Sequence, residues 1–197
     1  MSKYPSLFEK GLPDWHNNAC LNWTDMSYGY IEGYLRAANL LVDHINEHGR
    51  DQDTLVYPII FCYRHHLEIR MKEITKQGRN LLHGSGDYED GHRLTPLWVN
   101  CKSILLQVYE EFETPDEIAM IHQFVEELDK IDAGSDGFRY WESSKGKKSK
   151  QVIPRKPSLR DLREVNIRHF KDCANAMAKF LEGASMGIGA YLQHQQE

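Results

Sequence analysis

The amino-acid sequence predicts an all-α fold, a bundle of about five helices within a single domain that covers residues 1–197. Two observations predict it. Apolar residues recur at alternating spacings of three and four through five long segments, which is the period of an amphipathic helix. Residues that favour helix starts and stops flank these segments, whereas runs with strand character are short. A composition of 41% hydrophobic and 27% charged residues is that of a globular domain.

An irregular N-terminal segment over residues 1–24 precedes the first two expected helices. Thr24 or Asp25 would cap the first helix and Gly49 would end it. The second helix covers about residues 55–77, with Pro58 near its start, where a missing N–H costs little, and Gly78 near its end. The core-facing stripes consist of Ile31, Leu35, Ala38, Val42 and Ile45 in the first helix and Ile60, Tyr63, Leu67, Met71 and Ile74 in the second.

A proline in the first turn marks each of the next two helices. The third covers about residues 95–112 with Pro96 in its first turn, and the fourth follows Thr114 and Pro115, a cap and a first-turn proline. Their apolar stripes are Trp98, Cys101, Leu105, Val108 and Phe112 in the third helix and Ile118, Ile121, Val125, Leu128 and Ile131 in the fourth.

Glycine, serine and proline are frequent in residues 133–158, so this segment is expected to be a small hairpin or irregular insertion before the last helix. Residues 138–141 and 151–153 are its candidates for extended chain. Ser158 would then cap a long last helix. Its apolar line comprises Leu162, Val165, Phe170, Cys173, Met177, Leu181, Ala184 and Ile188.

With a formal net charge of -5, the protein as a whole repels nucleic acid, so any such contact requires a local basic patch. The insertion contains one, in which Glu142 is the single acid, and aromatic side chains are interleaved with it. This combination suits backbone phosphates and stacked single-stranded bases, although a solubilising loop has the same composition. The basic residues are Arg139, Lys145, Lys147, Lys148, Lys150, Arg155 and Lys156, and the aromatic ones are Phe138, Tyr140 and Trp141.

The second helix carries an unusual density of titratable groups. Arg64, Glu68 and Lys72 follow one another at four-residue steps and share one flank, with His65 beside them. If the flank faces solvent, these are ordinary surface ion pairs of small energy. If it faces another helix, the paired charges indicate either a buried ion pair that makes the packing specific or a polar binding site.

Histidines offer two further interpretations, metal binding and proton transfer. His44 and His48, or His65 with Glu68, have the spacing of helical metal ligands, but no two helices carry the Glu-x-x-His pattern of di-iron bundles. We therefore expect no metal and no cofactor. His83 and His92 fall in or beside the loop before the third helix, where they could act as an acid or base or only anchor the loop.

The four cysteines stand singly without a CxxC pair, which argues against a zinc site or a disulfide framework. No window approaches the roughly 18 apolar residues that a membrane-spanning helix needs. We therefore expect a cytoplasmic protein without a membrane partner.

Three short strings resemble the HEPN superfamily of bacterial proteins: YPIIFCYRHHLEIRMKEI at 57–74, GHRLTPLW at 91–98 and GFRYW at 137–141. The resemblance implies an antiparallel helical bundle. It also implies a choice of functions, because many HEPN proteins are metal-independent ribonucleases of toxin–antitoxin and anti-phage systems, whereas others are non-catalytic binding modules.

The catalytic motif of the family, an arginine followed by four to six residues and a histidine, matches Arg163 and His169 on the expected last helix. The resemblance implies that the histidine moves a proton and that the arginine stabilises phosphate charge in a homodimer, with an antitoxin or another defence-system protein as partner. Glu164 stands where the family usually has a polar residue such as Asn. The alternative is a non-catalytic module that binds a nucleotide, nucleic acid or partner protein through Arg64, His65, Glu68, His83 and His92, and a metal-dependent enzyme is a more distant third.

Overall fold

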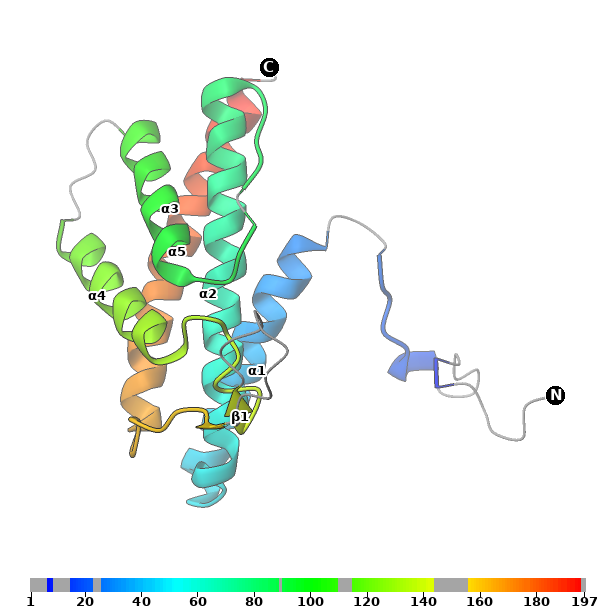
Figure 1. Cartoon of the computed structure of the whole chain (residues 1–197). Helices are drawn as coiled ribbons and strands as arrows, with labels where there is room; N and C mark the ends of the chain where they lie inside the picture. The colour runs from blue at the N-terminus through cyan, green and yellow to red at the C-terminus, as the bar shows by residue number, and fades with distance from the viewer. Residues whose placement is uncertain are drawn as a thin grey trace, which may run out of the picture.

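The computed structural model describes residues 7–8, 15–22, 26–88, 90–109, 115–143 and 156–195. Over these residues the predicted all-α bundle of five helices is confirmed (Figure 1). The helices are α1 (Ser27–His48), α2 (Gln52–His83), α3 (Leu94–Val108), α4 (Pro115–Asp132) and α5 (Ile167–His194). A 3-10 turn, η1 (Trp15–Asn17), precedes them, and the short strands β1 (Glu142–Ser143) and β2 (Lys156–Pro157) stand before α5. None of the described helices is long and apolar enough to cross a bilayer.

Helix α2 is the centre of the bundle, and α1, α3 and α5 all pack on it (Figure 1). Antiparallel packing holds for α1 with α2 and for α3 with α4. In contrast, α3 and α5 run in the same direction as α2. Arg64 contacts His92 just before α3, whereas Gly78 meets Ile104 near its end. Likewise, Tyr63 contacts Phe170 near the start of α5, whereas Glu73 accepts from Ser185 further along. The connection between α2 and α3 returns along α2, because His92 contacts Glu68 in the middle of that helix, and this lets α3 run parallel to α2.

The core is apolar and continuous across α2, α3, α4 and α5, and a smaller cluster joins α1 to α2 and α5. Phe138, from the insertion, belongs to the main cluster and is 6% exposed. The insertion is therefore anchored in the core by an aromatic side chain, which fixes its position against α2.

The predicted end of the second helix is wrong, because α2 continues through Gly78 and ends at His83, with Gly84 as its C-cap at a φ of 71°. Gly78 is buried where α3 crosses, and a Cβ there would lie 2.1 Å from Cγ2 of Ile104. The glycine thus permits close approach of two helices instead of terminating one. The first helix does end at Gly49 as predicted, with φ 64°, whereas its expected caps Thr24 and Asp25 lie outside the described residues.

The predicted start of the last helix is also wrong. Residues 158–166 are turns and irregular chain, and α5 begins at Ile167 with Asn166 as N-cap, whose Oδ1 accepts the N–H of His169 at 3.0 Å. Ser158 therefore precedes the helix by nine residues, and Arg163 does not lie on it. In the insertion, residues 138–141 are a turn, irregular chain and a bend, the strand follows at Glu142, and 151–153 lie outside the described residues.

Candidate functional site

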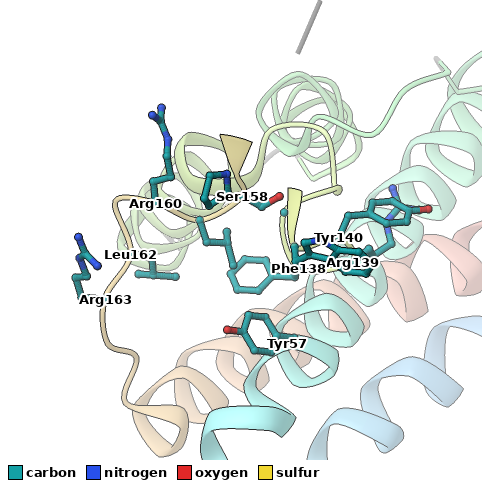
Figure 2. Close-up of a pocket in the computed structure, with 12 residues that line it drawn as sticks. Tyr57, Phe138, Arg139, Tyr140, Ser158, Arg160, Leu162 and Arg163 are labelled. Atoms are coloured by element: carbon teal, nitrogen blue, oxygen red, sulfur yellow. The ribbon is translucent and has the colours of Figure 1, made fainter. Parts of the chain in front are cut away.

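A pocket of about 470 Å³ lies between the insertion, the turn before α5 and the first turns of α2 (Figure 2). Three arginines line it, and the described lining residues include no Asp or Glu. Four aromatic rings line it as well. We call this the arginine–aromatic pocket; it is formed by Tyr57, Gly137, Phe138, Arg139, Tyr140, Trp141, Pro157, Ser158, Leu159, Arg160, Leu162 and Arg163.

One wall of the pocket is a turn held by a buried carboxylate. Asp132, the last residue of α4, accepts the backbone N–H groups of Asp136 and Gly137 at 2.8 Å each through its Oδ1. Two charge-assisted hydrogen bonds to one oxygen fix the chain immediately before Phe138. The turn therefore delivers Phe138 to the core while Arg139, Tyr140 and Trp141 remain exposed.

The opposite wall is positioned by the hairpin. Strand β1 pairs antiparallel with β2, with Glu142 opposite Pro157 and Ser143 opposite Lys156. The Ser158 N–H continues this pairing by donating to the Trp141 carbonyl at 2.9 Å. These backbone bonds hold residues 157–163 across from residues 137–141, although the two segments are far apart in sequence.

The three arginines differ in how far their charge is already compensated. Arg139 donates to Oδ1 of Asp136 at 2.8 Å and to the Ser135 carbonyl, and its guanidinium lies 5.7 Å from the ring centre of Phe61 and 5.4 Å from that of Tyr140. Arg160 and Arg163 are exposed and form no ion pair or hydrogen bond with any other side chain that the structure describes. Those two guanidinium groups are therefore free to bind an anion.

Ser158 contributes an unsatisfied hydroxyl to the same pocket. Its Oγ is buried and has no hydrogen-bond partner among the described residues. A buried polar group without a partner costs about 1–3 kcal/mol, so a ligand that supplied an acceptor here would recover this energy.

The charged flank of α2 is buried rather than solvated. Arg64 has 0% exposure, and its guanidinium donates to Oε2 of Glu68 at 3.3 Å and to the His92 carbonyl at 2.5 Å. Oε1 of Glu68 accepts Nζ of Lys72 and Nδ1 of His92, each at 2.9 Å. We call Arg64, Glu68, Lys72 and His92 the α2 polar network. It attaches the loop before α3 to the middle of α2.

Burial and pairing oppose each other in the α2 polar network. Burial raises the pKa of Glu68, but the hydrogen bonds from Lys72 and His92 outweigh it, so the pKa lies below its usual value. Burial likewise lowers the pKa of Arg64, against the attraction of Asp132 and Glu68. In this conformation Arg64 and Glu68 hold the loop, and their direct contact with a ligand stays a prediction.

His65 is half-buried and lies beside the pocket. Its ring stacks on Phe61 with centroids 5.6 Å apart and meets Tyr34 edge-on at 4.5 Å. Phe61 also lies under Arg139, so His65 supports the platform on which Arg139 rests. Burial lowers the pKa of His65, which favours the neutral ring.

The two loop histidines are not brought together. His92 lies in the α2 polar network with its side chain 66% exposed. His83 is exposed in the last turn of α2, fifteen residues after Glu68, which places it about 22 Å further along the helix.

Arg163 and His169 are both exposed, but on different elements. Arg163 lines the pocket from the turn before α5, whereas His169 lies in the first turn of α5 and is not part of the lining. The His169 Nε2 is 3.6 Å from Sγ of Cys173, whose pKa is raised, mainly by burial, so the thiol stays protonated. Glu164 is exposed and does not line the pocket. Lys147 and Lys148 lie outside the described residues.

Within the described residues, no three His, Cys, Asp or Glu side chains gather where a metal ion could be held. The His44 and His48 rings stack 4.5 Å apart, and Nε2 of His44 lies 3.2 Å from Oδ2 of Asp51. These contacts account for the histidine pair on α1 as a feature of the helix end.

Comparison with protein-family models, curated proteins and solved structures finds no match for this chain. The HEPN resemblance therefore stays a prediction, and the function is argued from the pocket.

Proposed function

We propose that this protein is a HEPN-like helical module that binds single-stranded RNA in the arginine–aromatic pocket. The observation that carries the proposal is the combination of three arginines and four aromatic rings, without a described carboxylate, in a pocket of about 470 Å³. Arginine binds phosphate through paired hydrogen bonds, and aromatic rings stack on bases of any sequence.

Exposure of the rings supports a single strand over a duplex. Trp141 is 82% exposed and Tyr140 54% exposed, so their faces are open to stacking. Bases in a duplex are already stacked on one another and offer no free face, whereas an unpaired base does. Each stacked base contributes about 1–3 kcal/mol. A local cluster of this kind is compatible with the net charge of -5, because phosphate attraction depends on the nearest charges.

Removing the two free guanidinium groups should weaken RNA binding. For Arg160→Ala with Arg163→Ala we expect the Kd for a single-stranded RNA of about ten nucleotides to rise about tenfold or more, because two phosphate contacts are lost. The logarithm of the association constant falls linearly with the logarithm of the salt concentration, and this slope should become shallower by about 1.4 for the same reason. Fluorescence anisotropy over a salt series measures both quantities.

The matched control is Arg36→Ala with Lys179→Ala, which removes the same charge from exposed positions on α1 and α5. Equal RNA affinity in the two double variants would show that only net charge matters and would contradict the proposal. Tighter binding of a duplex than of the single strand would contradict it as well.

RNA cleavage is a second candidate function, favoured by the exposure of His169 in the chain immediately after the pocket turn that carries Arg163. His169 would move the proton of the ribose 2′-hydroxyl or of the leaving oxygen, and Arg163 would stabilise charge on the phosphate. The HEPN resemblance adds a cytoplasmic homodimer and an antitoxin or other defence-system partner to this candidate.

Cleavage is tested by incubating total RNA and transfer RNA with the protein in a chelator, which excludes divalent metal. We expect shortened RNA with the wild type and at least a hundredfold slower cleavage with His169→Ala, the scale of a lost acid or base. His122→Ala, at a partly exposed histidine of α4, is the matched control. Equal cleavage by wild type and His169→Ala, or none by either, would remove this candidate and leave binding as the function.

A further inference from the structure

The free charge of the pocket is concentrated on one side. Arg160 and Arg163 are on this side, three residues apart in the segment before α5, whereas Arg139 and Tyr140 lie on the other side, with Phe138 and Tyr57 between them (Figure 2). Asp136 already compensates the charge of Arg139. The pocket therefore has a cationic side with two unpaired guanidinium groups and an aromatic side that is close to neutral.

The cationic side matches a terminal phosphate better than an internal one. A phosphomonoester carries a charge of about -1.5 to -2 and three free acceptor oxygens, whereas a phosphodiester within a strand carries a single charge. Two guanidinium groups supply two positive charges and several N–H donors. Ser158 also lines this pocket, and its hydroxyl, buried and without a described partner, has a proton left to donate.

The aromatic side suits the base of the same nucleotide. The guanidinium of Arg139 lies between the rings of Tyr140 and Phe61, so cation–π contacts already hold the Tyr140 ring in position. Trp141 adds an exposed ring next to it. A volume of about 470 Å³ lies within the range of small-ligand pockets, so it suits a single nucleotide better than a length of strand.

From this arrangement we propose that the pocket recognises a nucleoside phosphomonoester, with the phosphate on Arg160, Arg163 and Ser158 and the base on Tyr140 and Trp141. This inference rests on the proposed function and narrows it: the ligand is the phosphorylated end of a single strand, or a free mononucleotide with the same chemistry.

The test compares RNAs of one sequence that end in a 5′-phosphate, a 3′-phosphate or hydroxyl groups only, with the full-length protein. We expect a phosphate at one of the ends to tighten binding at least about tenfold. This gain in affinity from the terminal phosphate should vanish in the Arg160→Ala, Arg163→Ala double variant and persist in the Arg36→Ala, Lys179→Ala double variant. Ser158→Ala should lower the gain without unfolding the protein, because it removes a hydroxyl that has no described partner. Circular dichroism confirms that each variant is folded.

Adenosine 5′-monophosphate and adenosine, titrated by calorimetry, distinguish the two sources of the phosphate. At least about tenfold tighter binding of the monophosphate identifies a free nucleotide as sufficient, and a gain seen only with RNA identifies the strand end. Equal affinity for phosphorylated and unphosphorylated ligands in both series would overturn the inference while leaving RNA binding intact. Absence of RNA binding would instead overturn the proposed function, and the monophosphate titration would then decide the inference alone.

Discussion

Glu68→Ala is expected to lower the free energy of unfolding by about 3–5 kcal/mol. Glu68 has a side chain that is 2% exposed and accepts from Arg64, Lys72 and His92, so its removal leaves the fully buried Arg64 without its carboxylate partner. Breaking one member of a buried ion pair is costly because the remaining charge cannot reach water. Chemical denaturation at neutral pH measures the loss.

Glu68→Gln separates the charge from the volume of the side chain. Glutamine fills the same space but carries no charge, so we expect most of the loss to remain if the stranded Arg64 is its cause. Glu182→Ala, at an exposed position of α5, is the matched control and should change stability by less than about 0.5 kcal/mol. A loss below about 1 kcal/mol for Glu68→Ala would show that the α2 polar network does not hold the bundle together.

Acid should destabilise the protein through His66. Its Nδ1 donates to the Ile31 carbonyl at 2.9 Å, and its buried Nε2 has no described partner, so a second proton has no acceptor. Burial lowers the pKa from 6.5 to about 4. The unfolded chain therefore binds this proton at higher pH than the folded one. The contribution of neutral His66 to the free energy of unfolding is complete above about pH 6.5 and is lost as the pH falls towards 4.

His66→Asn keeps a donor near Nδ1 but cannot titrate. Between about pH 7 and pH 4 we expect the free energy of unfolding to fall by about 3 kcal/mol more in the wild type than in this variant. One unit of pKa shift corresponds to about 1.4 kcal/mol. His122→Asn, at a partly exposed position of α4, is the matched control for the loss of a histidine. Parallel curves for wild type and His66→Asn would contradict the assignment of this proton to His66.

Local sequence rules predicted the helices well where the signal itself was local. Gly49 ends α1 with a positive φ, and Pro115 opens α4, because both residues act through their own backbone. Gly78 misled the prediction, because its reason to be glycine is the Ile104 side chain of another helix. The spacing of Arg64 and Glu68 likewise predicted an ion pair, but its burial depends on α3 and the loop before it.

The candidate site was only half predictable. The sequence marked Arg139, Tyr140 and Trp141 as a basic and aromatic group, and these residues do line the pocket. Arg160 and Tyr57 were missed, because both reach the site through tertiary packing. The hairpin pairing positions the segment that carries Arg160, and the buried Phe138 holds the insertion against α2, which carries Tyr57. One signal was overlooked: Asn166 is a strong N-cap residue, and choosing it over Ser158 would have left residues 158–165 free to form a binding loop.

Ultraviolet crosslinking of the full-length protein to single-stranded RNA, with mass-spectrometric mapping of the crosslinked peptides, tests the binding claim most directly. The proposal predicts adducts on peptides that contain Tyr140, Trp141 or Tyr57, and their loss in Arg160→Ala with Arg163→Ala. The exposed Trp15 on η1 serves as an internal reference for nonspecific reaction. Adducts on the Trp15 peptide alone, or equal adducts in the wild type and the double variant, would contradict RNA binding in the arginine–aromatic pocket.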